Sequence, residues 1–147
     1  MINFRELCKR GAERVIMAVT DVTLGQDVAV DVRGETNGEV IVEYCDMASI
    51  KSVRNFCTKI LEQESRIHIL INQACVMWHP YRQTAEGHEY HWGVNHLAHF
   101  VMTQLLMPLL LRGAPDARHA RSLSNFAAAL RRDFRIRKSR KIAKIAL

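Results

Sequence analysis

The sequence predicts an α/β fold in which helices cover a parallel sheet. Short apolar stretches of strand length recur at 14–19, 39–45 and 67–72. Segments with helical spacing lie between these stretches. The stretch 67–71 is apolar at nearly every position, as expected for a parallel strand buried on both faces. This alternation of strand and helix favours right-handed crossover connections between parallel strands.

Local signals place the elements of the first part of the chain. Residues 3–11 are predicted to be the end of a helix that Gly11 stops. After the first strand, residues 22–33 have helical spacing, although their β-branched residues weaken a helix. Asn37-Gly38 is a turn signal, and the alternating apolar residues that follow it predict the strand at 39–45.

Capping residues mark two further helices. Ser49 is a favourable N-cap for a helix whose apolar stripe runs over residues 50–61. Thr84 is expected to cap a long helix that continues through Arg112. Gly113 and the proline two residues later are predicted to end that helix.

Length and composition place limits on the class of protein. A chain of 147 residues is long enough for one domain with a hydrophobic core, and its ordinary apolar and charged content excludes wholesale disorder. The most apolar stretch, 100–111, is short for a membrane span, and no signal peptide is recognisable, so we expect a cytoplasmic location. The four cysteines form no C-x-x-C pair and are expected to be reduced thiols.

The net charge of +6 is distributed unevenly. From Arg112 onward, eleven basic residues stand against two acidic ones, so this part carries +9 and the rest −3. We therefore expect a partial domain at 1–113 and a basic tail at 114–147 that is irregular or helical. The tail has only two aromatic residues and no known nucleic-acid motif, which makes nucleic-acid binding a weak alternative.

Three groups of residues form recognisable motifs. The first is Arg14-Val-Ile-Met-Ala-Val-Thr-Asp21, and the second is Cys45-Asp-Met-Ala-Ser-Ile-Lys-Ser-Val53. The third begins with Ile69-Leu-Ile-Asn-Gln-Ala-Cys-Val-Met77 and ends with Gly93-Val-Asn-His-Leu-Ala-His-Phe100. In order and spacing they resemble the retinol-dehydrogenase-like branch of the short-chain dehydrogenase/reductase family. The corresponding family patterns are A-C-R-D, L-D-L-A-S-L-x-S-V, I-L-I-N-N-A-G-V-M and G-V-N-H-L-G-H-F.

The resemblance implies a fold and a reaction. The fold is a partial, truncated Rossmann-type doubly wound parallel sheet. The reaction is an NAD(P)-dependent oxidation or reduction of retinol, retinal or a similar hydrophobic alcohol or carbonyl. The cofactor is NADP or NAD. In such folds the ligands bind at the carboxyl ends of the strands.

The resemblance assigns Thr20 and Asp21 to the adenosine ribose, because an acid at the end of this strand accepts hydrogen bonds from ribose hydroxyls. Thr20 replaces the family's arginine, so a preference for the 2′-phosphate of NADP does not follow. Asp21 has an alternative role as the cap of the next helix. Asp46 and Met47 match the pair that brackets the adenine ring, and Asp46 is alternatively a polar turn residue ahead of the Ser49 cap.

Gln73 and Ala74 match the turn that passes beside the cofactor ribose. This turn departs from N-N-A-G twice, at Gln73 and at Cys75. The family's glycine lets the backbone approach the ribose closely, and Cys75 adds a side chain there. Both changes predict weak cofactor binding.

Asn95 matches the catalytic asparagine of the family, which holds a water that links to the lysine of the proton relay. Its neighbours His88, His91, His96 and His99 suggest metal binding at first sight. The spacing is not H-E-x-x-H, however, and the last two histidines are normal for the family motif. We therefore expect no metal site.

Two family motifs are missing from the 147 residues. No set of glycines fits G-x-x-x-G-x-G, which holds the pyrophosphate, and no tyrosine has a lysine four positions later. Ser122 and Ser124 lie about where the family's serine strand begins, but the apolar alternation of that strand is absent. The chain is therefore expected to be catalytically inactive.

The missing first strand creates a topological problem. In the family that strand lies between the strands matched by 14–19 and 67–72. Its absence predicts a gap of about 9.6 Å with two unpaired apolar edges. The resemblance also implies an alternative function as a non-catalytic partner, which docks on a full-length relative through the helix at 85–112, because in the family this helix commonly packs across a dimer interface.

Overall fold

The computed structural model describes residues 8–9, 12, 14–36, 38–114, 121–124 and 143–146. Within these residues, five strands form one parallel sheet in the order β2-β1-β5-β3-β4. The strands are β1 (Arg14–Val19), β2 (Glu39–Tyr44), β3 (Ile69–Asn72), β4 (Arg121–Ser124) and β5 (Ala143–Ala146). The predicted α/β class is confirmed, as are the three parallel strands expected from the sequence.

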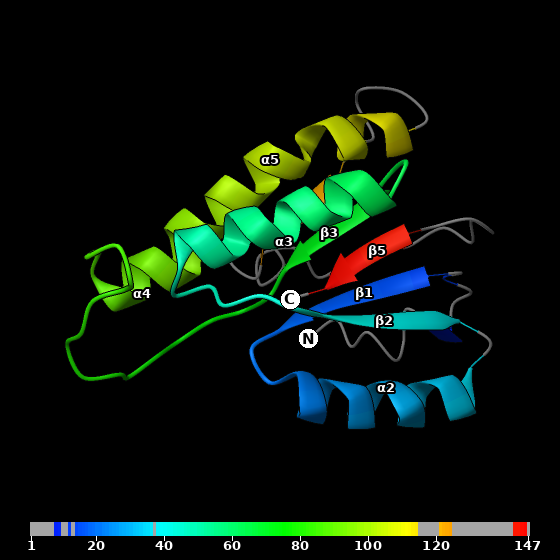
Figure 1. The fold of residues 1–147 in the computed structure, drawn as a ribbon, viewed down its shortest axis with the longest axis horizontal. Helices are drawn as coiled ribbons and strands as arrows, with labels where there is room; N and C mark the ends of the chain where they lie inside the picture. The colour runs from blue at the N-terminus through cyan, green and yellow to red at the C-terminus, as the bar shows by residue number, and fades with distance from the viewer. Residues whose placement is uncertain are drawn as a thin grey trace, which may run out of the picture.

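Helices cover both faces of the sheet (Figure 1). Helix α2 (Val22–Glu35) lies on one face, and α3 (Ile50–Gln63) and α5 (Ala98–Gly113) pack together on the other. A short helix α4 (Tyr90–Trp92) and a π-helical turn η1 (Gly93–Leu97) lead into α5. This is the doubly wound arrangement that the sequence predicts.

Strand β1 contributes to the core on both of its faces. Ile16 and Ala18 pack with α3 and α5, whereas Val15 and Met17 pack with α2. Side chains of successive strand residues point to opposite faces, so a nearly continuous apolar run is what a strand covered on both sides requires. The same reasoning explains β3, which is buried at all four positions.

The predicted start of the long helix at Thr84 is wrong. The helix begins at Tyr90, and Glu89 is its N-cap, accepting from the backbone N–H groups of His91 and Trp92. Thr84 lies instead in the preceding turn, where its hydroxyl accepts from the N–H of His88 at 3.2 Å. No such signal marks Glu89 in the sequence, because glutamate is not among the residues that are strongly preferred at an N-cap.

The structure corrects the prediction of an unpaired gap. Strand β5 comes from the basic tail and lies between β1 and β3, with Ile145 aligned with Ile16 on one side and with Leu70 on the other. The tail was expected to be irregular or helical, yet both of its described segments are strands. The remaining tail residues, and residues 3–7 of the expected first helix, lie outside the described residues.

Strand β4 also differs from expectation. It pairs with β3 and aligns Ser124 with Asn72, although its sequence has no apolar alternation. β4 forms a strand without the apolar alternation because its backbone N–H and C=O groups pair with those of β3, and such pairing is open to any residue that has an N–H group.

The continuous helical segment Tyr90–Gly113 contains an 18-residue window with a mean hydropathy of 1.3, so by length and composition alone it is able to cross a membrane. In the structure it packs on the sheet and on α3, with Met102, Leu106 and Leu109 fully buried. Helices in protein cores meet the same criteria.

Replacing Ile145 by proline is expected to destabilise the chain, because proline has no N–H for the ladder at the centre of the sheet. Leaving a buried backbone group unpaired costs about 1–3 kcal/mol. Thermal unfolding followed by circular dichroism measures the effect, with Ile145→Val as the matched control. A proline variant as stable as the control would contradict the central position of β5.

Candidate functional site

The residues that the sequence assigns to a cofactor lie at one edge of the sheet. All the strands are parallel, so their carboxyl ends meet at the same edge. Thr20 and Asp21 directly follow β1, and Gln73 directly follows β3. Asp46 and Met47 follow β2 after one intervening residue. The fold therefore brings these three segments to a common edge, as predicted.

Asp21 caps α2. Its Oδ1 accepts from the backbone N–H of Leu24 at 3.0 Å, so the capping alternative is realised in the structure. Both Thr20 and Asp21 are exposed to solvent. The cap uses one carboxylate oxygen, and the ribose role of Asp21 stays a prediction.

Asp46 forms a tight polar turn. Its Oδ1 accepts from the N–H of Ala48 at 2.8 Å, and its own N–H donates to the Ser52 hydroxyl at 2.9 Å. Met47 is buried in the core, with 6% of its surface exposed. The polar-turn alternative therefore describes the local structure, and only the backbone of Met47 is suited to meet an adenine.

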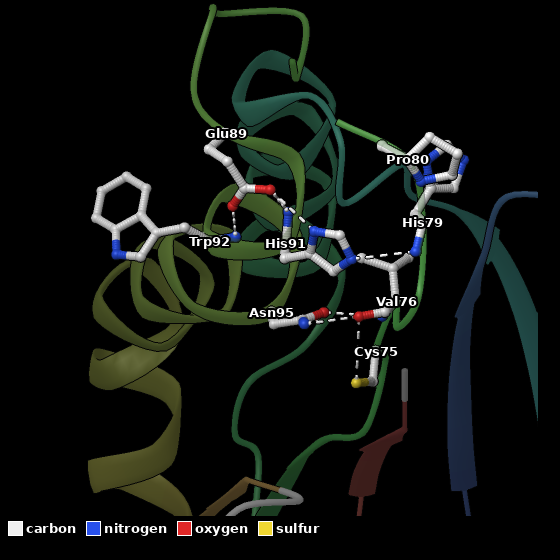
Figure 2. A network of polar contacts seen from close by, with 8 residues as sticks. All are labelled: Cys75, Val76, His79, Pro80, Glu89, His91, Trp92 and Asn95. Carbon is white, nitrogen blue, oxygen red and sulfur yellow. Dashed lines mark hydrogen bonds and ion pairs between the residues drawn. The ribbon is translucent and has the colours of Figure 1, made fainter. Parts of the chain in front are cut away.

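The segment that follows β3 is held by the helix on which Asn95 lies. The Asn95 side chain accepts from the N–H of Val76 at 2.8 Å and donates to the carbonyl of Val76 at 2.9 Å (Figure 2). The same helix holds Ala74, whose carbonyl lies 2.8 Å from Nε2 of His99. The two hydrogen bonds to Val76 explain why an asparagine, which has a low helix propensity, occurs inside this helix. The role of Asn95 in holding a catalytic water stays a prediction.

Asn95 belongs to the π-helical turn η1. Such turns are rare and often occur at functional sites, since they change which carbonyl groups the helix satisfies. In this turn the N–H of Ala98 reaches back to the carbonyl of Gly93, five residues earlier.

His99 is a site residue that sequence reasoning missed. It is buried, with 6% of its surface exposed. A carbonyl can only accept, so Nε2 must carry the proton that binds Ala74, and Nδ1 is left as a bare acceptor without a hydrogen-bond partner. Burial lowers the pKa of His99 and keeps the ring neutral, and His96 nearby adds to this effect. Its position four residues after Asn95 was the available signal.

A second polar contact holds the loop beyond Val76 (Figure 2). His91 Nδ1 lies 2.9 Å from Glu89 Oε1, and His91 Nε2 accepts from the N–H of His79 at 3.3 Å. Hydrogen bonds from the N–H groups of Trp92 and His91, and then from the His91 ring, lower the pKa of Glu89 to about 2. The loop itself is exposed, and Trp78 has a φ of 58°, which a side chain of this size rarely adopts.

The cysteines differ in accessibility. Cys8, Cys45 and Cys57 are buried, and burial raises the pKa of Cys45 and of Cys57 to about 12. Cys75 is exposed, between the two residues that the helix pins. Among the described residues, no group of three or more His, Cys, Asp or Glu side chains is placed to hold a metal ion.

The fold and this edge define a doubly wound α/β protein of the dinucleotide-binding type. Residues 4–118 match the short chain dehydrogenase family model. The chain therefore belongs to the short-chain dehydrogenase family.

Among curated proteins, the chain is similar to retinol dehydrogenases. The chain is 47% identical to retinol dehydrogenase 12 of Homo sapiens over 112 residues, which are 76% of this chain and 35% of the relative. It is 46% identical to human retinol dehydrogenase 13 over 112 residues, 76% of this chain and 34% of that relative. The chain thus spans about a third of the length of these relatives.

Solved structures show the same fold. A putative uncharacterized protein from Mycobacterium paratuberculosis matches with a TM-score of 0.62 and 42% identity, over 72% of this chain and 36% of the other. The RhlG/NADP active-site complex of Pseudomonas aeruginosa matches with a TM-score of 0.65 and 25% identity, over 81% and 48% of the two chains.

Acid is expected to destabilise the protein partly through His99. The folded-state pKa of His99 is lowered, so its contribution is complete above the unfolded pKa of about 6.5 and is lost as the pH falls from there towards the folded value. One such proton costs up to about 1.4 kcal/mol per pH unit. His99→Gln keeps a donor for Ala74 and cannot titrate. The free energy of unfolding in urea, compared at about pH 7.5 and about pH 5.5, should therefore fall less in the variant. An equal fall in both proteins would refute this.

Proposed function

We propose that this chain is a retinol-dehydrogenase-like oxidoreductase relative that carries the adenosine and ribose side of a nicotinamide cofactor site but does not catalyse turnover by itself. The observation that carries the proposal is the meeting of three motif-bearing segments at one sheet edge. They bring Asp21, Asp46 and the segment Gln73-Ala74 to the carboxyl ends of β1, β2 and β3.

The chemistry of this edge suits an adenosine. The Asp21 and Asp46 carboxylates are acceptors for ribose hydroxyls and for an exocyclic amine. Each also makes a local turn or cap, and these contacts use Oδ1. A carboxylate oxygen accepts more than one hydrogen bond, so the structural and binding roles are compatible.

Turnover needs a group that moves a proton. The 147 residues contain no Tyr-x-x-x-Lys, and the amide of Asn95 does not titrate near neutral pH. Asn95 is moreover engaged by Val76 on both of its polar atoms. Because the named relatives are retinol dehydrogenases, we propose a hydrophobic alcohol or carbonyl as the substrate class of the full-length kin.

Cofactor binding by the purified chain is expected to be weak, because no glycine loop in the 147 residues holds the pyrophosphate and Cys75 adds bulk beside the ribose. Titration with NADH and NADPH, followed by nicotinamide fluorescence, measures it. Micromolar affinity for either would contradict this expectation.

Oxidation of retinol and reduction of retinal are expected to stay at background. A missing acid–base group alone removes a factor of about 10²–10⁴. The control is Asn95→Ala. Turnover that disappears in this variant would refute inactivity, and turnover that persists equally in it points to a contaminating host dehydrogenase.

A second candidate function is association through the long helix. A row of rings begins two residues before this helix and continues along it, with successive centroids 5.5, 6.0 and 6.4 Å apart; its members are His88, Trp92, His96 and Phe100. Trp92 and Phe100 are 49% and 54% exposed, and Figure 2 shows Trp92 directed away from the other labelled side chains. An exposed aromatic row on an otherwise packed helix favours pairing with a copy of the same helix, from a second chain or a full-length relative.

Phe100→Glu is expected to abolish this association, because pairing would bury the introduced charge. Sedimentation velocity across a concentration series measures the oligomeric state. The matched control is Val30→Glu on α2, which changes a 62% exposed apolar residue on the opposite face of the sheet. A monomeric wild-type chain at all concentrations would contradict self-association.

A further inference from the structure

Three polar side chains at four-residue spacing on the η1–α5 helix hold alternate residues of the segment 72–76. The Asn95 amide binds both backbone groups of Val76, at 2.8 and 2.9 Å. Further along, Nε2 of His99 donates to the carbonyl of Ala74 at 2.8 Å, and the Thr103 hydroxyl accepts from the Asn72 side chain at 3.1 Å. We call these three contacts the polar ladder.

The spacing of the polar ladder has a geometric cause. Four residues of helix rise about 6 Å. Two residues of extended chain advance about 6.6 Å. Every fourth residue of a helix can therefore contact every second residue of an extended chain that runs alongside it, because the two spacings are nearly equal. Residues 73 and 75 fall between the contacts, and Cys75 is exposed.

The middle contact is the most constrained. His99 is almost fully buried, and its Nδ1 has no hydrogen-bond partner among the described residues. A buried ring with one unpaired acceptor is costly, so packing alone would favour an apolar side chain here. The hydrogen bond to the Ala74 carbonyl is what an apolar side chain cannot supply. Thr103 supports His99 from the same helix, donating to the His99 carbonyl at 2.8 Å.

We propose that His99 is a positioning residue that fixes the Ala74 peptide, and that the polar ladder sets the conformation of the ribose-side segment 73–75 before any cofactor binds. The link to the ribose rests on the proposed function. The positioning itself concerns only the chain and can be measured without a cofactor.

Cys75 provides a local probe of this segment. It is exposed, whereas Cys8, Cys45 and Cys57 are buried. Alkylation by iodoacetamide, resolved by peptide mass spectrometry, therefore reports on the segment at Cys75 and on unfolding at the three buried thiols. Hydrogen exchange of the amides at 74–77 gives a second local measurement.

His99→Leu removes the donor, and His99→Gln is expected to restore it, because the Gln amide extends to about the position of Nε2. Loss of one hydrogen bond corresponds to about a 5–10-fold change in a local opening equilibrium. We expect Cys75 alkylation and exchange at 74–77 to be faster by that factor in His99→Leu and close to wild type in His99→Gln. Unchanged rates in a folded His99→Leu, or equal acceleration in both variants, would overturn the proposal.

Labelling of the buried thiols shows whether His99→Leu has unfolded. In that case His99→Asn replaces it, because Asn carries the same amide as Gln but is too short to reach Ala74. Faster Cys75 alkylation and amide exchange in His99→Asn than in His99→Gln would support the proposal. Equal rates in the two variants would overturn it. Millimolar NADPH added to the wild type tests the proposed function separately. Protection of Cys75 supports the cofactor edge, and its absence counts against that edge while leaving the polar ladder unaffected.

Discussion

The backbone hydrogen bonds on the two sides of β5 are the interaction on which the rest of the structure depends. β1 and β3 each have one other neighbour in the sheet, and each needs a second because its central position buries N–H and C=O groups that must be paired. β5 provides both sets of partners in parallel register. The sheet is thereby continuous, so α2 on one face and the α3–α5 pair on the other pack against a single layer.

The candidate site follows from that continuity. Parallel strands place Asp21, Asp46 and Gln73 at one edge, and the α3–α5 pair brings the helix of Asn95 and His99 against the segment after β3. Side chains of the helix hold the segment at Ala74 and Val76. Cys75 lies between these two contacts and is exposed to solvent.

The departures of this chain from its family are therefore of two physical kinds. Changes at the edge, such as Cys75 where the family pattern has glycine, add a side chain where a ligand would approach. The 147 residues contain no Tyr-x-x-x-Lys, and the two polar side chains nearest the segment are already engaged, since Asn95 binds Val76 and His99 is buried with a lowered pKa.

The sequence by itself determined what short-range physics controls. The apolar runs of β1 and β3, the Ser49 cap of α3 and the motif residues at the strand ends were all readable, because burial periodicity and capping act over a few residues. Only the tertiary structure placed β5 in the centre of the sheet and paired His99 with Ala74. These outcomes depend on which distant backbone groups need a partner. The pairing of residues 25 or more positions apart leaves no periodic mark in the sequence.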